Sequence, residues 1–495
     1  MAVRFMRGHR RGPRSRRPTI LRTPGRGSRW FAAVSAVATA TVVGLAGAGP
    51  AGAEPFNVMA IPEQIPRAID GTIPAPPYPR LTTIPQRAMA PGMSHRVQEL
   101  REATLPSPTG DPFFDRWSPA LSTMTPGQLI ASRDVTRTAT QEAIVPIRSA
   151  RQVKFATRDA TGRPSFGTAT VLVPRKAWPG RGPRPIVVNN IPIDALGAAC
   201  TPGVTLAGGI SPATNPTDYL PPTTQLALDH GYTVLIPDHQ GPRMAYAEPT
   251  VAGHIILDSI RAIAAYDADA FGHSRIGMFG YSGGAIATKG AALLTKTYAP
   301  ELSSRIVGAA FGGVPADFQM LAGSMNANLA TGLFHAALFG ISRERPELLP
   351  LANHLAQWLA TSPLKNACSI PAILLGATFW PAQLLSNVAD PFHSPAAREI
   401  YRATKMQGMK SSVPLYIYNG AQEFWIPAAG ARNLFRDQCR LGADATYREV
   451  FGEHIIAMAT GYPEAMTGST PASKAHPHTA VADPFSWLRC RSSAG

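Results

Sequence analysis

Charged residues are sparse in this chain of 495 residues: 16% are Asp, Glu, Lys or Arg, whereas 45% are hydrophobic. This balance excludes a disordered protein, which has too few apolar side chains to form a core. Acidic residues are absent from residues 1–53, which hold ten arginines, so the formal charge of +16 falls to +6 for the remaining chain. The remainder has no basic run interleaved with aromatic residues, and we expect no nucleic-acid partner.

A long apolar run is also missing at the N-terminus. Residues 30–46 are apolar, but this stretch is shorter than the about 20 residues that span a bilayer. It follows the arginine-rich start and precedes Ala51-Gly52-Ala53, a small-residue cleavage pattern. We therefore expect residues 1–53 to be a signal peptide rather than an anchor helix, and the mature chain to be secreted without a transmembrane segment, either outside the cell or in its envelope. Arg16-Arg17 resembles a twin-arginine signal but Pro18-Thr19 fits it poorly, so the export route stays open.

Cysteine is scarce, and all four residues follow the predicted cleavage point: Cys200, Cys368, Cys439 and Cys490. An even number in an exported chain indicates two disulfides, for which three pairings are allowed. The spacings match no CxxC-type zinc site, so we expect neither a metal site nor a cofactor.

Proline is concentrated in residues 54–110, where it disfavours both helix and central strand. We expect this segment to be a linker, a pro-segment or a wrapped arm. The runs 151–157 and 165–173 read as strands around the turn composition Asp159-Ala160-Thr161-Gly162, which predicts a hairpin at the start of the catalytic domain.

Short apolar runs then alternate with helical patterns, which predicts a mostly parallel sheet covered on both faces. The strand-like runs are 185–188, 232–237, 275–279 and 306–311, and the helix-like stretches are 253–266 and 285–298. Residues 318–410 break this rhythm with helical stretches such as 329–339 and 349–359, and the strand pattern resumes at 413–418. We expect an α/β fold with core segments 111–317 and 411–495 and an inserted helical cap at 318–410.

The sequence Gly280-Tyr281-Ser282-Gly283-Gly284 joins a strand-like run to a helix-like one. Gly-x-Ser-x-Gly in this setting is a nucleophile elbow, a strained turn that projects the serine oxygen and needs glycine where side chains would collide. Ser282 is the candidate nucleophile of a serine hydrolase with the α/β-hydrolase fold. We expect Tyr281 to pack within the elbow.

A candidate acid and base follow in the order that this fold requires. Glu423 lies in a turn after the strand ending at 418, and His454 follows the strand-like run 445–451. The imidazole would take the serine proton and return it to the leaving group, while the carboxylate would fix the tautomer. Asp317 is the rival acid.

His476 and His478 are rival bases, but they lie in Ser/Thr/Pro-rich sequence that predicts a mobile loop. Glu453 could support His454, although a solvated carboxylate is the preferred interpretation. The developing oxyanion needs two donors, one from the N–H after the nucleophile and one from the loop after the third core strand. These criteria indicate Gly283 and the region of Ile193 and Asp194, where Asp194 could also be an ordinary turn residue.

The order of motifs resembles the secretory lipase family. The resemblance extends over about residues 111–460 and rests on matched motifs: Asp111-Pro112-Phe113-Phe114, Pro126-Gly127, Arg133-Asp134-Val135, the loop 190–202 with Cys-x-Pro, Pro237-Asp238 before Gly241-Pro242, and the elbow. The family pattern Gly-x-x-Asp-x-x-x-Pro aligns Gly420 and Pro427, so Glu423 stands in place of the aspartate and is longer by one methylene.

The resemblance implies a secreted triacylglycerol lipase whose substrate is a lipid or another ester, with contact at the lipid–water interface. It implies disulfides Cys200–Cys368 and Cys439–Cys490, a second oxyanion donor at Asp194, and a cap that forms an acyl tunnel or lid. Two other interpretations stay open: an esterase or acyltransferase of narrower substrate range, and a non-catalytic envelope-binding protein on the same fold.

Overall fold

The computed structural model describes residues 62–209, 222–469 and 487–490. The chain divides into two units, Met1–Pro55 and Phe56–Gly495, and all described residues belong to the second. The expected signal peptide and the rival bases His476 and His478 lie outside the described residues.

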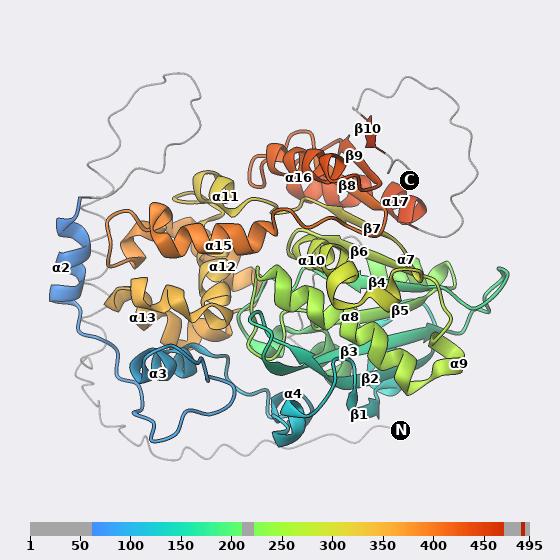
Figure 1. Cartoon of the computed structure of the whole chain (residues 1–495), viewed down its shortest axis with the longest axis horizontal. Coiled ribbons are helices and arrows are strands. Elements are labelled where there is room, and N and C mark those ends of the chain that lie inside the picture. Colours follow the sequence, from blue (N-terminus) through green and yellow to red (C-terminus); the bar gives the residue numbers. More distant parts are fainter. Residues whose placement is uncertain (1–61, 210–221, 470–486, 491–495) are drawn as a thin grey trace, which may run out of the picture. The chain divides into compact units, whose positions relative to one another are not determined.

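One ten-stranded sheet organises the second unit, in the order β1-β2-β3-β5-β4-β6-β7-β8-β9-β10 (Figure 1). The strands from β5 to β9 pair in parallel, whereas β1, β2, β3 and β10 join antiparallel at the two edges. The predicted hairpin is β2 and β3, and its turn is closed by Asp159 Oδ1, which accepts from Thr161 N and Arg163 N. The bounds are β1 Leu129–Asp134, β2 Ile147–Arg158, β3 Pro164–Pro174, β4 Ile186–Asn190, β5 Thr233–Pro237, β6 Ile276–Tyr281, β7 Ile306–Gly312, β8 Leu415–Gly420, β9 Ala445–Val450 and β10 Trp487–Cys490.

Helices cover both faces of this sheet, because alternate residues of each central strand point to opposite sides. In β8, Leu415 and Ile417 pack into one core and Tyr416 and Tyr418 into the other. The first face carries α8 (Pro249–Tyr266), α10 (Gly283–Tyr298) and α16 (Ala428–Arg440), with α9 (Ala268–Phe271) following α8. The second carries α5 (Thr136–Glu142), α6 (Pro202–Gly208), α7 (Thr223–Asp229) and α17 (His454–Ser469). This is the predicted α/β architecture with a mostly parallel centre.

Residues 318–410, which we call the cap, form helices with a separate apolar core. These are α11 (Phe318–Ser324), α12 (Thr331–Glu344), α13 (His354–Thr361), α14 (Ser369–Leu374) and α15 (Pro395–Lys405). The continuous helix predicted over 349–359 is wrong: a 3-10 helix, Pro346–Leu351, precedes α13. Pro350 lies in the 3-10 helix, and the Asn353 side chain caps α13 by accepting from Ala356 N.

The segment 62–110, which we call the arm, contains helices that its proline content led us not to expect. They are α2 (Gln64–Thr72) and α3 (His95–Thr104), and α4 (Pro112–Asp115) follows. The first two lie against cap helix α13 (Figure 1). Asp70 accepts from His354 N at 2.7 Å, and the buried Arg101 donates from Nε to Arg343 O at 2.7 Å. Tertiary contacts of this kind override the local preference against helix.

Two disulfides join Cys200 to Cys368 and Cys439 to Cys490, the pairing that the resemblance implies. The first connects the loop after β4 to the start of α14 in the cap. The second connects α16 to the edge strand β10. None of the helices among the described residues is both long and apolar enough to cross a membrane.

Candidate active site

Ser282 lies between the last residue of β6 and the first of α10, as the elbow motif predicts. Its backbone has φ 53° and ψ −120°, a region that costs a residue with a side chain about 1–3 kcal/mol. The surrounding backbone holds it there: Ser282 N donates to Gly312 O at 3.0 Å. A Cβ at Gly284 would lie 1.8 Å from Asn190 O, so only glycine permits this close approach.

Three predicted residues from distant parts of the chain meet at this turn. His454, the first residue of α17, has Nε2 3.0 Å from Ser282 Oγ and Nδ1 2.7 Å from Glu423 Oε2. Glu423 lies in the turn after β8, and its side chain is fully buried. The structure therefore brings the predicted nucleophile, base and acid into one chain of hydrogen bonds.

The turn after β8 also fixes the second carboxylate oxygen of Glu423. Oε1 accepts from Trp425 N at 2.9 Å and from Ile426 N at 3.1 Å. Burial alone would raise the pKa of Glu423, but the hydrogen bond and charge of His454 and these two N–H groups lower it further than burial raises it. The carboxylate is thus ionised at neutral pH, and its extra methylene is accommodated without loss of the His454 contact.

The rival acid Asp317 lies elsewhere. It caps α11 by accepting from Gln319 N at 3.1 Å, and it pairs with Lys405 Nζ at 2.9 Å. Glu453, which we expect to be solvated, is partly exposed, and its two oxygens each accept at 3.0 Å from Ile455 N and Ile456 N. Glu453 therefore caps the helix that begins at His454.

Tyr281 packs within the elbow as expected and makes one contact that the sequence did not predict. Its hydroxyl donates to His454 O at 2.7 Å, and the two rings lie 5.1 Å apart between centroids. Burial raises the pKa of Tyr281 well above its usual value, so the hydroxyl stays protonated as a donor. The residue before the nucleophile thus fixes the backbone of the base.

Gly283 and Asp194 lie in contact beside Ser282. A Cβ at Gly283 would lie 1.7 Å from Asp194 Oδ1, and Gly283 begins the 16-residue helix α10, whose N-terminus favours negative charge. Asp194 is buried and has φ 46°. Burial raises the pKa of its carboxyl to about 7, although the charge of His454 opposes this shift.

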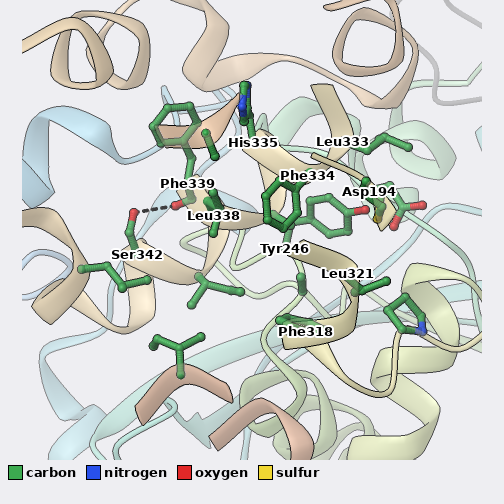
Figure 2. A pocket seen from close by; sticks show the side chains of 18 of the residues that line it. Asp194, Tyr246, Phe318, Leu321, Leu333, Phe334, His335, Leu338, Phe339 and Ser342 are labelled. Carbon is green, nitrogen blue, oxygen red and sulfur yellow. Dashed lines mark hydrogen bonds between the residues drawn. The ribbon is translucent and has the colours of Figure 1, made fainter. Parts of the chain in front are cut away.

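The sequence did not point to two buried residues near the loop after β4 that carries Asp194. His239 Nε2 lies 2.8 Å from Ile191 O; because a carbonyl only accepts, Nε2 carries the proton and donates. Burial lowers the pKa of His239 to about 4, which keeps the ring neutral. Tyr246 lines the cavity with its hydroxyl toward Asp194 (Figure 2). The matched motif Pro237-Asp238 before Gly241-Pro242, which encloses His239, was the one available signal.

A cavity of about 350 Å³ opens above Ser282 and His454. Its wall is apolar and is built largely by cap helices, with Phe318 and Leu321 from α11 and Phe334 and Leu338 from α12 (Figure 2). This volume is within the range of small-molecule sites. No group of three or more His, Cys, Asp or Glu side chains in the described ranges is arranged to hold a metal ion.

Comparison with known proteins places this chain among the lipases. A family model described as secretory lipase matches residues 222–471, about half of the chain. A probable inactive lipase of Mycobacterium tuberculosis is 28% identical over 72% of this chain and 81% of its own length. A secreted triacylglycerol lipase of Malassezia restricta is 27% identical over 70% of this chain and 75% of its own length. The crystal structure of Candida antarctica lipase A in its closed state aligns with a TM-score of 0.65 and 26% identity, covering 74% of this chain and 88% of that one.

Proposed function

Because the chain belongs to the secretory lipase family, we propose that it is a carboxylic-ester hydrolase, and specifically a triacylglycerol lipase, that forms an acyl-enzyme on Ser282. The observation that carries this proposal is the hydrogen-bonded chain from Ser282 through His454 to Glu423 at the base of an apolar cavity. The relative from Malassezia restricta is described as a secreted triacylglycerol lipase, which supports the substrate class.

Ser282 Oγ attacks the ester carbonyl carbon while His454 Nε2 takes its proton. The carbonyl oxygen becomes an oxyanion, which the N–H groups of Gly283 and Asp194 receive as donors. The imidazolium, stabilised by the ionised Glu423, gives the proton to the leaving alcohol, and the acyl group stays on Oγ. Water then repeats the sequence, with its proton passing through His454 to Oγ, and releases the carboxylic acid.

The cap supplies the preference for lipids. An acyl chain that enters the cavity gains about 0.8 kcal/mol for each buried methylene, so affinity rises with chain length until the cavity is filled. The wall beside Ser282 offers Phe318, Leu321 and Ile426 for this contact.

The surface near the cavity suits contact with a lipid–water interface. Ile370, Ile373 and Ile455 line the cavity and are also 52%, 43% and 55% exposed. Leu374, which lies with Ile370 and Ile373 on α14, is 69% exposed. Exposed apolar groups of this kind mark interaction sites, and the expected signal peptide at residues 1–53 would bring them to an extracellular lipid.

The test is hydrolysis of a graded series from tributyrin to triolein by the wild type and by Ser282→Ala. We expect measurable turnover of long-chain glycerides by the wild type and loss of at least about a thousandfold in the variant. A fluorophosphonate probe should label the wild type alone. If butyrate esters are hydrolysed and long-chain glycerides are not, the protein is an esterase of narrower range; released fatty esters with alcohol acceptors would indicate an acyltransferase.

A non-catalytic role is the second candidate, because one relative is described as a probable inactive lipase. The complete Ser282–His454–Glu423 chain argues against this role here. Folded wild-type protein that the fluorophosphonate does not label would favour binding over catalysis.

A further inference from the structure

The loop that follows β4 carries a strained residue at its centre. Residues 191–200, which we call the oxyanion loop, place Asp194 at φ 46°, a conformation that costs a non-glycine residue about 1–3 kcal/mol. Such a conformation persists only where the surrounding structure holds it. The groups that hold this loop therefore control the direction of the Asp194 N–H.

One set of these groups comes from the cap. Leu196 N donates to Ala367 O at 2.8 Å, and the disulfide joins Cys200, at the end of the oxyanion loop, to Cys368. We call residues 365–368 the cap root, because they lead into α14. Two points on the oxyanion loop, Leu196 and Cys200, are thus attached to two consecutive residues of the cap root, Ala367 and Cys368.

Arg343, near the end of cap helix α12, makes a further connection. Its side chain is 1% exposed, and its guanidinium donates to backbone carbonyls of several segments. These acceptors are Leu196 O at 2.7 Å in the oxyanion loop, Lys365 O at 2.8 Å in the cap root, Thr104 O at 3.1 Å in the arm, and Arg243 O and Met244 O, both at 3.2 Å, after β5. One rigid planar group therefore sets the distance between the oxyanion loop and the cap root.

The opposite end of the loop is attached to the core. His239, on the segment after β5, donates to Ile191 O at 2.8 Å. Ile193 and Ala195, on either side of Asp194, are fully buried and pack with Met244 and Cys200. The core therefore fixes the beginning of the loop, and the cap root and Arg343 fix its end.

We propose that Arg343 and the Cys200–Cys368 disulfide are positioning elements for catalysis, which hold the Asp194 N–H where the oxyanion forms. The cap then has a second role: besides enclosing the acyl chain, it maintains the geometry of bond making. This inference rests on the proposed ester-hydrolase function.

The expected signature is a loss of rate without a loss of substrate binding. A donor aimed at the oxyanion is used in the transition state and not in the ground state, so its displacement lowers kcat and leaves KM nearly unchanged. Removal of a whole oxyanion donor costs about 100- to 1000-fold, and a partial displacement costs less.

The chain offers a matched control for this test, because its second disulfide, Cys439–Cys490, lies between α16 and the edge strand β10. We would compare Cys200→Ala/Cys368→Ala with Cys439→Ala/Cys490→Ala, using soluble 4-nitrophenyl butyrate and a trifluoromethyl ketone that mimics the tetrahedral intermediate. For the first variant we expect kcat about tenfold to a hundredfold lower, KM within about twofold, and inhibitor affinity weakened by the same factor as kcat/KM. For the second we expect kcat within about twofold of wild type, even where both variants lose similar thermal stability.

Arg343→Lys provides an independent variant that keeps the charge and loses the planar fork. It should shift kcat and inhibitor affinity in the same direction as loss of the Cys200–Cys368 bond. The proposal would be overturned if the two disulfide variants lost kcat equally. It would also be overturned if Cys200→Ala/Cys368→Ala and Arg343→Lys both bound the inhibitor as tightly as the wild type does. A wild-type protein that hydrolyses no ester and resists the fluorophosphonate would instead overturn the proposed function.

Discussion

Replacement of Glu423 by aspartate and by glutamine separates the length of this side chain from its charge. Glu423 accepts from His454 Nδ1 at 2.7 Å through one oxygen and from Trp425 N and Ile426 N through the other. Glu423→Asp withdraws the carboxylate by one C–C bond, about 1.5 Å, so the shorter arm reaches the imidazole or the turn but not both. Glu423→Gln keeps the length and removes the charge.

The magnitudes follow from these contacts. A hydrogen bond to a charged group contributes about 1.5–3 kcal/mol, and each 1.4 kcal/mol is a factor of ten, so Glu423→Asp should lower kcat by about ten- to a hundredfold. Glu423→Gln should cost about 10⁴-fold, because an amide neither holds the reactive tautomer nor stabilises the imidazolium. The aspartate variant should therefore be the more active of the two by about a hundred- to a thousandfold.

The assay is steady-state hydrolysis of 4-nitrophenyl butyrate at pH 7.5, with circular dichroism to verify folding. Asp317→Asn is the matched control, because Asp317 caps α11 and pairs with Lys405 away from the imidazole, and asparagine can still cap the helix. It should retain kcat within about threefold. Glu423→Gln with more than a tenth of the wild-type kcat, or Asp317→Asn with a 10⁴-fold loss, would refute the assignment of the acid.

Three further perturbations test the same site. Burial raises the pKa of Asp194 to about 7, so its carboxyl is neutral below that pH and anionic above it. Because the anion repels the developing oxyanion, kcat should fall as the pH rises through 7. Asp194→Asn should remove this alkaline decline from the pH–rate profile, and an unchanged profile would contradict it. Tyr281→Phe keeps the ring and loses the 2.7 Å hydrogen bond to His454 O, so it should lower kcat about three- to tenfold at constant KM. An increase in KM alone would instead assign Tyr281 to substrate binding. Ala337→Phe adds a ring to the cavity wall, so it should reduce the hydrolysis of 4-nitrophenyl laurate at least about tenfold relative to that of 4-nitrophenyl butyrate. Equal losses for the two esters would mean that acyl chains bind outside this cavity.

The sequence predicted the central strands because they are buried on both faces and therefore read as continuous apolar runs. β4 and β5 are fully buried along their length, and both were expected within one or two residues of their bounds. β1 escaped prediction since Leu129–Asp134 is an edge strand with polar, half-exposed positions. The arm helices α2 and α3 also escaped, because contacts with the cap outweigh the proline-rich composition.

The catalytic candidates were accessible for a different reason. Ser282, Glu423 and His454 each follow a predicted strand, and the ends of parallel strands meet at one edge of the sheet. Both Glu423 and Asp317 follow strands, so the sequence favoured Glu423 by its place after the late strand and by the family pattern, and the folded geometry shows that this carboxylate is the one that faces the imidazole.

Arg343 carried no signal in the sequence. Its acceptors are backbone carbonyls of segments that lie up to 239 residues from Arg343 in the sequence, which no local pattern encodes. Residues that act on the backbone of another segment are defined by tertiary structure alone.

The contacts between the arm and the cap determine which segments of this chain can be replaced by those of a relative. Asp70 holds the start of α13, Arg101 donates to Arg343 O, and Pro74 O accepts from Trp358 Nε1 at 2.8 Å. A chimaera that receives a foreign cap on this arm, or a foreign arm on this cap, would mismatch the donors and acceptors of these contacts. Modular engineering of chain-length preference should therefore transplant residues 62–104 and 318–410 together, although more than 200 residues separate them in the sequence.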